Sequence, residues 1–172
     1  EDSGEYLEHL LIGGELDVAV MVTSGLRERG ALQVEILSVS PYRLWMPLGH
    51  PLATRESIEV SDLAGEALIV LRADEMEEEA VNLLAGLGAR PRVAFRTRSV
   101  EAVRSLVATG AGVALLPDLV YRPWSLEGDR IESRDVSGAL PVVQVGMVWR
   151  RGAPLSPPAR DFVSMAKAAH GR

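Results

Sequence analysis

Apolar positions along residues 98–117 change from a helical to a strand spacing, which makes this stretch the most informative part of the chain. Ser99 is a typical helix N-cap, and apolar residues follow it three or four positions apart. They are Val100, Val103, Leu106 and Val107. Residues 113–116 are then apolar throughout, as in a parallel strand covered on both faces. The pattern predicts a strand end, a Ser-capped helix with Glu101 and Arg104 outside its apolar stripe, and a buried strand.

The rest of the chain shows the same alternation of helical and strand spacings, which is typical of α/β proteins. The predicted strands cover residues 16–22, 31–39, 42–47, 67–71, 92–97, 113–116, 131–136 and 144–149. The predicted helices start at Ser3, Asp74, Ser99 and Ser156, with a short helical turn at 61–64. Pro41 is expected to break the chain between two of these strands.

The order of these elements predicts two lobes. Residues 67–117 read as βαβαβ, and right-handed βαβ units build a parallel sheet. The last strand and helix cannot easily extend that unit, so we place them with the N-terminal elements. The predicted fold class is therefore α/β, with two Rossmann-like lobes joined by two crossovers. Lobe I combines residues 1–46 and 142–172, lobe II covers 55–133, and the crossovers lie near 47–54 and 134–141.

The composition restricts the chemistry of the chain. The formal net charge is −6 and basic residues are dispersed, which argues against direct binding of a nucleic-acid backbone by these residues. No cysteine is present, so the chain has no disulfide, thiolate nucleophile or thiolate metal site. The histidines lack metal-site spacing, and no apolar run approaches the roughly 18 residues of a membrane span. We expect no cofactor, no metal and no membrane, and, with no secretory leader visible, a cytoplasmic location.

Ser99 is the strongest candidate for contact with a ligand. The N-terminus of its helix should face the carboxyl ends of the parallel strands, where backbone N–H groups and the helix dipole favour small anions. An ordinary structural cap is the alternative. Ser3 is the corresponding cap in lobe I. Thr23 and Ser24 follow the predicted strand 16–22, where a solvated turn is an equally good interpretation.

Three further residues complete the set of ligand-binding candidates. Arg72 directly follows the predicted strand 67–71, and its guanidinium could bind a carboxylate, although pairing with neighbouring acidic residues is the more ordinary interpretation. Val100 is the first residue of the predicted helix. Pro117 ends a strand at the same edge and is equally well explained as a structural stop.

No catalytic or nucleotide-binding motif is found. The sequence GAG at 110–112 is half a dinucleotide fingerprint, but it opens a strand rather than a helix. His50 has no acid or serine at a useful spacing, and the acidic run 74–79 is best read as a solvated helix face. We therefore predict that the chain is not an enzyme and has no catalytic residues.

Blocks of sequence in a fixed order resemble the effector-binding domain of LysR-type transcriptional regulators. They are GGELDVAV at 13–20, PLGHPLA at 47–53, SDLAGEALIV at 61–70, SVEAVRSLVATGAGVALLP at 99–117 and the tail WRRGAPLSPPARDFV at 149–163. The resemblance implies a fold of the periplasmic-binding-protein type II kind, with a small effector held between the lobes. It also implies that Ser99 lines the effector pocket and that Ser3 matches a hydroxyl position used in some relatives.

The resemblance further implies an N-terminal winged helix-turn-helix domain that binds DNA. Neither that domain nor the first elements of lobe I are found in this sequence, so we expect an N-terminally truncated regulator that contacts DNA only through the missing domain. The expected partners are a small anionic metabolite and a second copy of the chain, in a homodimer or higher homo-oligomer. Its contact face is predicted at helix 76–87 and strand 92–97.

The alternative is an extracytoplasmic solute-binding protein of an importer, which has the same architecture. A secretory leader upstream would support that reading, whereas an upstream helix-turn-helix would exclude it. The family blocks favour the effector-sensing part of a regulator.

Overall fold

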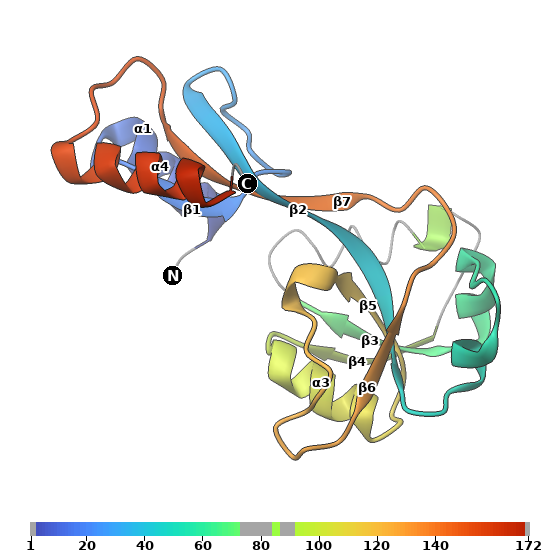
Figure 1. Ribbon diagram of the computed structural model, residues 1–172. Coiled ribbons are helices and arrows are strands. Elements are labelled where there is room, and N and C mark those ends of the chain that lie inside the picture. The colour runs from blue at the N-terminus through green and yellow to red at the C-terminus, as the bar shows by residue number, and fades with distance from the viewer. Residues whose placement is uncertain (1–2, 73–83, 87–91, 171–172) are drawn as a thin grey trace. The chain divides into compact units, whose positions relative to one another are not determined.

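The computed structural model describes residues 3–72, 84–86 and 92–170. The chain divides into two compact units (Figure 1). Unit 1 consists of residues 1–39 and 143–172, and unit 2 consists of residues 40–142. Each unit has its own hydrophobic core.

Unit 1 combines two helices with a short antiparallel sheet. Its elements are α1 (Gly4–Gly13), β1 (Ala19–Val22), the first half of β2 (Leu32–Pro47), β7 (Val142–Arg150) and α4 (Pro157–His170). β1 pairs antiparallel with β7, which is also hydrogen-bonded to β2. The core joins the apolar side of α1 to inward-facing strand residues. It consists of Leu11, Ala19, Met21, Leu26, Leu32 and Val148.

A parallel sheet lies at the centre of unit 2, which explains why these strands are apolar on both faces. Its elements are β3 (Ala67–Leu71), β4 (Arg92–Thr97), α3 (Val100–Ala108), β5 (Ala114–Pro117) and β6 (Ile131–Arg134). β3 pairs in parallel with β4, and Leu68 bridges in parallel to Val113 at the start of β5. α3 packs on β3, and Figure 1 shows it beside the three parallel strands. The β–α–β unit predicted after residue 92 is confirmed.

The second half of β2 pairs with two strands in unit 2, and with β6 it forms an antiparallel ribbon. Residues 42–45 pair with β5 and residues 44–47 with β6. The connections include the 3-10 helices η1 (Pro51–Thr54), η2 (Val60–Gly65) and η3 (Asp118–Val120). The ribbon and the parallel strands share one core with α3. Its residues are Trp45, Ile69, Leu71, Val103, Val107, Ala114, Leu116 and Ile131.

Among the strand boundaries that differ from the sequence prediction, those at Pro41 and Leu16 have a clear physical reason. Pro41 does not interrupt β2, because it is exposed and the ladder with β5 begins one residue later. A proline costs little where no ladder hydrogen bond needs its missing N–H, and its fixed φ suits an extended chain. The first strand starts at Ala19 rather than at Leu16, since the Leu16 N–H donates back to the Leu10 carbonyl at 3.2 Å.

The division into units falls within the long strands and not at the predicted crossovers. Residues 47–54 and 134–141 both lie inside unit 2. Pairing of the second half of β2 with β5 and β6 places it in unit 2. The Arg134 guanidinium adds to this by donating to the carbonyls of Ala53 and Arg55, which joins the two predicted crossovers to each other.

The prediction that Arg104 lies outside the apolar stripe of α3 is wrong, because the residue is only 7% exposed. Its guanidinium pairs with Glu101, donates to the Val120 carbonyl at 2.6 Å and lies 5.9 Å from the centre of the Trp45 ring. An arginine can be buried when its charge and its donors find partners. Spacing alone could not reveal this, because the partners come from other elements.

Part of the sequence prediction lies outside the described residues. The helix predicted from Asp74 is described at residues 84–86, where Leu84 is buried. The remainder of that helix, and with it most of the predicted contact face at 76–87, falls outside the described ranges. Within those ranges, no helix is long and apolar enough to cross a membrane.

Candidate functional site

The carboxyl ends of the parallel strands bring several predicted residues to one edge of unit 2. Arg72 follows β3, Ser99 follows β4, and Pro117 ends β5. The Arg72 N–H donates to the Thr97 carbonyl at 2.6 Å, which ties the ends of β3 and β4 together. Ligands of open α/β sheets bind at such edges. This edge is therefore the candidate site that unit 2 offers.

Ser99 caps α3 as the sequence predicts. Its hydroxyl accepts from the Ala102 N–H at 3.2 Å, and its carbonyl accepts from the Val103 N–H at 3.1 Å. On the strand side, the Ser99 N–H donates to the Thr97 hydroxyl oxygen at 3.1 Å. The side chain is exposed. A capping hydroxyl that accepts can still donate its own hydrogen, so Ser99 remains able to bind an acceptor on a ligand.

The other candidates of unit 2 differ in their exposure. Arg72 is exposed, and a guanidinium is a donor whose chemistry suits an anion. Val100 is half-buried and packs against the core of unit 2. Pro117 is buried, pairs with Tyr42 of β2 and caps η3. Thus Arg72 and Ser99 present polar groups at the edge, whereas Val100 and Pro117 support it.

The candidates of unit 1 are placed less favourably. Thr23 is only 2% exposed, and its hydroxyl donates to the Gln144 carbonyl at 3.3 Å. Ser24 is exposed, and its carbonyl accepts from the Arg29 guanidinium at 3.3 Å. Ser3 caps α1, with its hydroxyl accepting from the Tyr6 N–H at 3.4 Å. Contact of these three residues with a ligand stays a prediction.

Sequence analysis missed two residues that organise these loops. Thr97 binds both Arg72 and Ser99 through its carbonyl and hydroxyl, and its position two residues before a capping serine was the available signal. Glu8 is buried on α1, where its carboxylate accepts from the N–H groups of Arg27 and Glu28, each at 3.1 Å. Nothing in its helical position marks Glu8 as different from a solvated acid.

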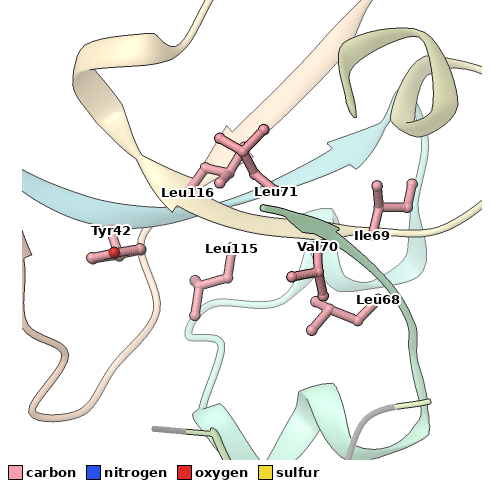
Figure 2. A pocket seen from close by; sticks show the side chains of 7 residues that line it. All are labelled: Tyr42, Leu68, Ile69, Val70, Leu71, Leu115 and Leu116. Carbon is pink, nitrogen blue, oxygen red and sulfur yellow. The ribbon is translucent and has the colours of Figure 1, made fainter. Parts of the chain in front are cut away.

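A small apolar pocket in unit 2 is too small for a metabolite. Figure 2 shows Leu68, Val70 and Leu115 on one side of the strands, with Leu71 and Leu116 on the other. Tyr42 and Ile69 complete its lining. The cavity volume is about 10 Å³, near the size that holds one water molecule. The pocket therefore belongs to the packing of the strands.

Several titratable groups of unit 2 are shifted by their surroundings. The backbone N–H of Glu59 and the Arg55 guanidinium lower the pKa of Asp62. The hydroxyl of Ser105, which donates at 2.7 Å, lowers the pKa of Glu127. Burial raises the pKa of Tyr121. Each of these groups serves a local structural contact rather than the strand edge.

The polar groups at this strand edge are hydrogen-bond donors. Ser99, the first N–H groups of α3 and the Arg72 guanidinium all donate, and helix geometry leaves those N–H groups without intrahelical partners. The positive end of the helix dipole adds to the same field. The described residues contain no cluster of side chains that could hold a metal ion. Such an arrangement is suited to binding an anion.

Comparison with known proteins begins with a family model and curated relatives. The model described as the LysR substrate binding domain matches residues 1–171. The DNA-binding transcriptional dual regulator OxyR of Escherichia coli is 32% identical over 152 residues, covering 84% of this chain and 47% of the relative. An uncharacterized HTH-type transcriptional regulator, YybE of Bacillus subtilis, is 28% identical over 165 residues, covering 91% and 52%. The chain spans about half the length of the curated relatives it matches.

Solved structures agree with the family model. The C-terminal domain of a probable LysR family transcriptional regulator from Rhodococcus superposes with a TM-score of 0.85 at 30% identity, covering 97% of this chain and 82% of that one. The reduced OxyR regulatory domain from Pseudomonas aeruginosa gives 0.73 at 26% identity, covering 96% and 79%. These neighbours have the periplasmic-binding-protein type II fold, which confirms the predicted fold class. The chain belongs to the LysR substrate binding domain family.

Proposed function

We propose that this chain is the effector-sensing domain of a LysR-type DNA-binding transcriptional regulator, and that it binds a small anionic metabolite through Ser99 and Arg72. The observation that supports this is a pair of hydrogen bonds made by Thr97. Its carbonyl accepts from the Arg72 N–H and its hydroxyl accepts from the Ser99 N–H, so the backbones that carry the two candidate donors meet at one strand edge.

The sign of the ligand's charge follows from the groups at this edge. A guanidinium and a helix N-terminus both favour negative charge, and the guanidinium can bind a carboxylate or phosphate with two parallel hydrogen bonds. The proposed ligand class is therefore small carboxylates and phosphate esters.

Signal transmission requires the ligand to prefer one conformation of the domain. A ligand with equal affinity for both states shifts neither population. In the proposed regulator the preferred state alters DNA binding by a helix-turn-helix domain of the whole protein. The domain acts as a homodimer, since symmetric half-sites are read by symmetric proteins. The relatives named above are transcriptional regulators, which favours this proposal over the importer alternative.

The chemistry of the signal differs from thiol oxidation. Similar proteins are named hydrogen peroxide-inducible genes activators. Peroxide reacts with proteins most readily at cysteine thiolates, and these 172 residues contain no cysteine. Binding of a metabolite, rather than oxidation of a thiol, is thus the proposed input for this domain.

Calorimetry on defined ligands tests the proposal. A thermal-shift screen of carboxylates and phosphate esters first selects a ligand, and the wild-type chain is then compared with Ser99→Gly and Arg72→Ala. Glycine is a good N-cap without a hydroxyl, so Ser99→Gly removes the ligand contact while costing the helix only a few tenths of a kcal/mol. We expect at least about a tenfold loss of affinity in each variant, the effect of roughly one charge-assisted hydrogen bond.

Unchanged affinity in both variants would overturn the proposal. The matched control is Ser61→Ala, which alters an exposed serine of η2 away from the strand edge. A gel-shift measurement on the full-length gene product, with and without the selected ligand, then tests the regulatory role.

A further inference from the structure

Unit 2 contains buried polar side-chain atoms beside its apolar core, and three of them come from α3 and the strands that it covers. They are Trp45 Nε1, Arg104 Nε and Ser133 Oγ, and none has a hydrogen-bond partner among the described residues. Trp45 is fully buried and Arg104 is 7% exposed. Buried polar groups in native proteins are nearly always paired with protein or with ordered water. Each of these atoms therefore requires a partner.

The three atoms lie on the same side of one ribbon. Trp45 of β2 and Ser133 of β6 are directly opposite in the antiparallel register, so their side chains project from the same face. Ile131, two residues from Ser133 on β6, belongs to the core cluster with Trp45, which identifies that face as the one covered by α3. Arg104 of α3 places its guanidinium 5.9 Å from the Trp45 ring centre. The three residues thus come together where α3 covers the ribbon.

The chemistry of these atoms defines what can satisfy them. The indole Nε1 and the guanidinium Nε can only donate, whereas the serine hydroxyl can donate or accept. A single partner for all three atoms must therefore accept two hydrogen bonds. It must also be small, because Trp45 and Val103 beside it are fully buried in a packed core.

The charge of Arg104 is already matched, which argues against a bound anion. Its Nη1 pairs with Glu101, and its Nη2 donates to the Val120 carbonyl at 2.6 Å. An anion added here would leave one buried negative charge in excess, which is costly in an apolar core. A neutral molecule that accepts two hydrogen bonds and donates one fits the requirement, and water does both.

We propose that one buried water molecule occupies this position, accepting from Trp45 Nε1 and Arg104 Nε and donating to Ser133 Oγ. Three hydrogen bonds are the usual number for a buried water. The water would join α3 to β2 and β6 through Arg104, Trp45 and Ser133. This site is independent of the proposed effector, and its tests use the chain without any ligand.

Nuclear Overhauser measurements between water and indole protons test the proposal on the unaltered sequence. We expect a cross-peak from the Trp45 indole proton to a long-lived water. The other two tryptophans are Trp124 and Trp149, and the variants Trp124→Phe and Trp149→Phe assign their indole signals. Trp124 is 52% exposed and provides the comparison with fast-exchanging surface water. A Trp45 indole proton without a long-lived water partner would overturn the proposal.

The sign of a mutational effect gives a second test. If Ser133 Oγ were unpaired, Ser133→Ala would remove a buried polar group without a partner and would stabilise the chain or leave it unchanged. With the bridging water, we expect Ser133→Ala to lower the folding equilibrium constant about 3- to 10-fold. In a double-mutant cycle with Trp45→Phe, the combined loss should be smaller than the product of the single losses, because both remove the same water.

A salt titration separates water from an anion. Chloride and formate are compared at constant ionic strength by urea unfolding of the wild-type chain and of Ser133→Ala. Equal salt dependence in both proteins supports water. Stabilisation by either anion that is lost in Ser133→Ala would show an anion in the site and would overturn the proposal.

Discussion

Ser3 in unit 1 and Ser99 in unit 2 cap their helices with the same hydrogen bond, and Ser99 makes a further hydrogen bond to the strand before its helix. Both hydroxyls accept from the third N–H of their helix, at 3.4 Å and 3.2 Å. Ser99 is also bound from the strand side by Thr97, which holds Arg72 as well. The backbone of Ser99 is therefore held both by its helix and by the sheet edge.

Thr23 extends this contrast, because it also follows a strand but uses its hydroxyl within the fold. Its side chain is buried and donates to Gln144, while that of Ser99 is exposed. Hydroxyl residues at strand ends are therefore not equivalent candidates. What distinguishes them is whether the fold already satisfies the hydroxyl.

The largest expected effect comes from breaking the sheet that supports the Ser99 side of the comparison. A Cβ at Gly112 would lie 2.3 Å from the Ala67 carbonyl oxygen, so Gly112→Ala must displace the backbone of β3. Overpacking of this kind costs about 2–3 kcal/mol in the free energy of unfolding. Urea unfolding measures the loss. Gly65→Ala is the matched control, because no atom lies within 4 Å of its added Cβ.

A somewhat smaller effect is expected in unit 1 from the buried carboxylate of Glu8. Glu8→Ala leaves the N–H groups of Arg27 and Glu28 without their acceptor, which should cost about 1–3 kcal/mol. Glu5→Ala is the control, since Glu5 makes an exposed ion pair with Arg27 that contributes less than about 1 kcal/mol. Equal losses in the two variants, measured by thermal unfolding, would contradict a special role for Glu8.

Substitutions at Thr23 and Ser99 test directly whether the two hydroxyls differ in their contributions to stability and to ligand affinity. Thr23→Val keeps the shape but removes the hydroxyl, so we expect a loss of about 1 kcal/mol in stability with unchanged ligand affinity. Ser99→Gly should do the reverse, with a stability loss of a few tenths of a kcal/mol and weakened binding. Calorimetric binding and urea unfolding on both variants resolve the two effects. Weakened binding in Thr23→Val would place its hydroxyl in the site after all.

The smallest effect concerns the acid sensitivity of unit 2. The Glu59 N–H and the Arg55 guanidinium hold the pKa of Asp62 below its ordinary value of 3.8. A lowered pKa contributes stability that is present above the unfolded value and is lost as the pH falls through the folded value. Asp62→Asn should therefore reduce the loss of stability on going below about pH 4. Urea midpoints at about pH 5 and pH 3 measure this, and an unaltered pH dependence would contradict it.

The sequence allowed accurate prediction where local signals and tertiary structure agree. β3 and β4 have the predicted bounds, and Ser99 caps its helix, because apolar runs and capping chemistry are local properties. Arg104 and Thr97 were misjudged or missed for the opposite reason. Their roles depend on partners from other elements, namely Val120 and Trp45 for Arg104, and Arg72 for Thr97.

The structural roles of the glycines in residues 110–112 also could not be predicted from the sequence. Gly110 adopts a φ of 78° after α3, and Gly112 allows β3 to approach. Both are requirements of a helix end and of close backbone contact, not of nucleotide binding. The incomplete motif already argued against nucleotide binding, and the structure explains why glycine occurs at positions 110 and 112.

Thr97 connects two backbone segments at the strand edge. Its carbonyl accepts a hydrogen bond from the Arg72 N–H, and its hydroxyl oxygen accepts one from the Ser99 N–H. The backbone of Ser99, at the start of α3, is therefore linked through Thr97 to the residue that follows β3. The carbonyl and the hydroxyl of one threonine thus connect the beginning of the helix to the ends of two neighbouring strands, β3 and β4, so that a displacement at Ser99 concerns the sheet as well as the helix.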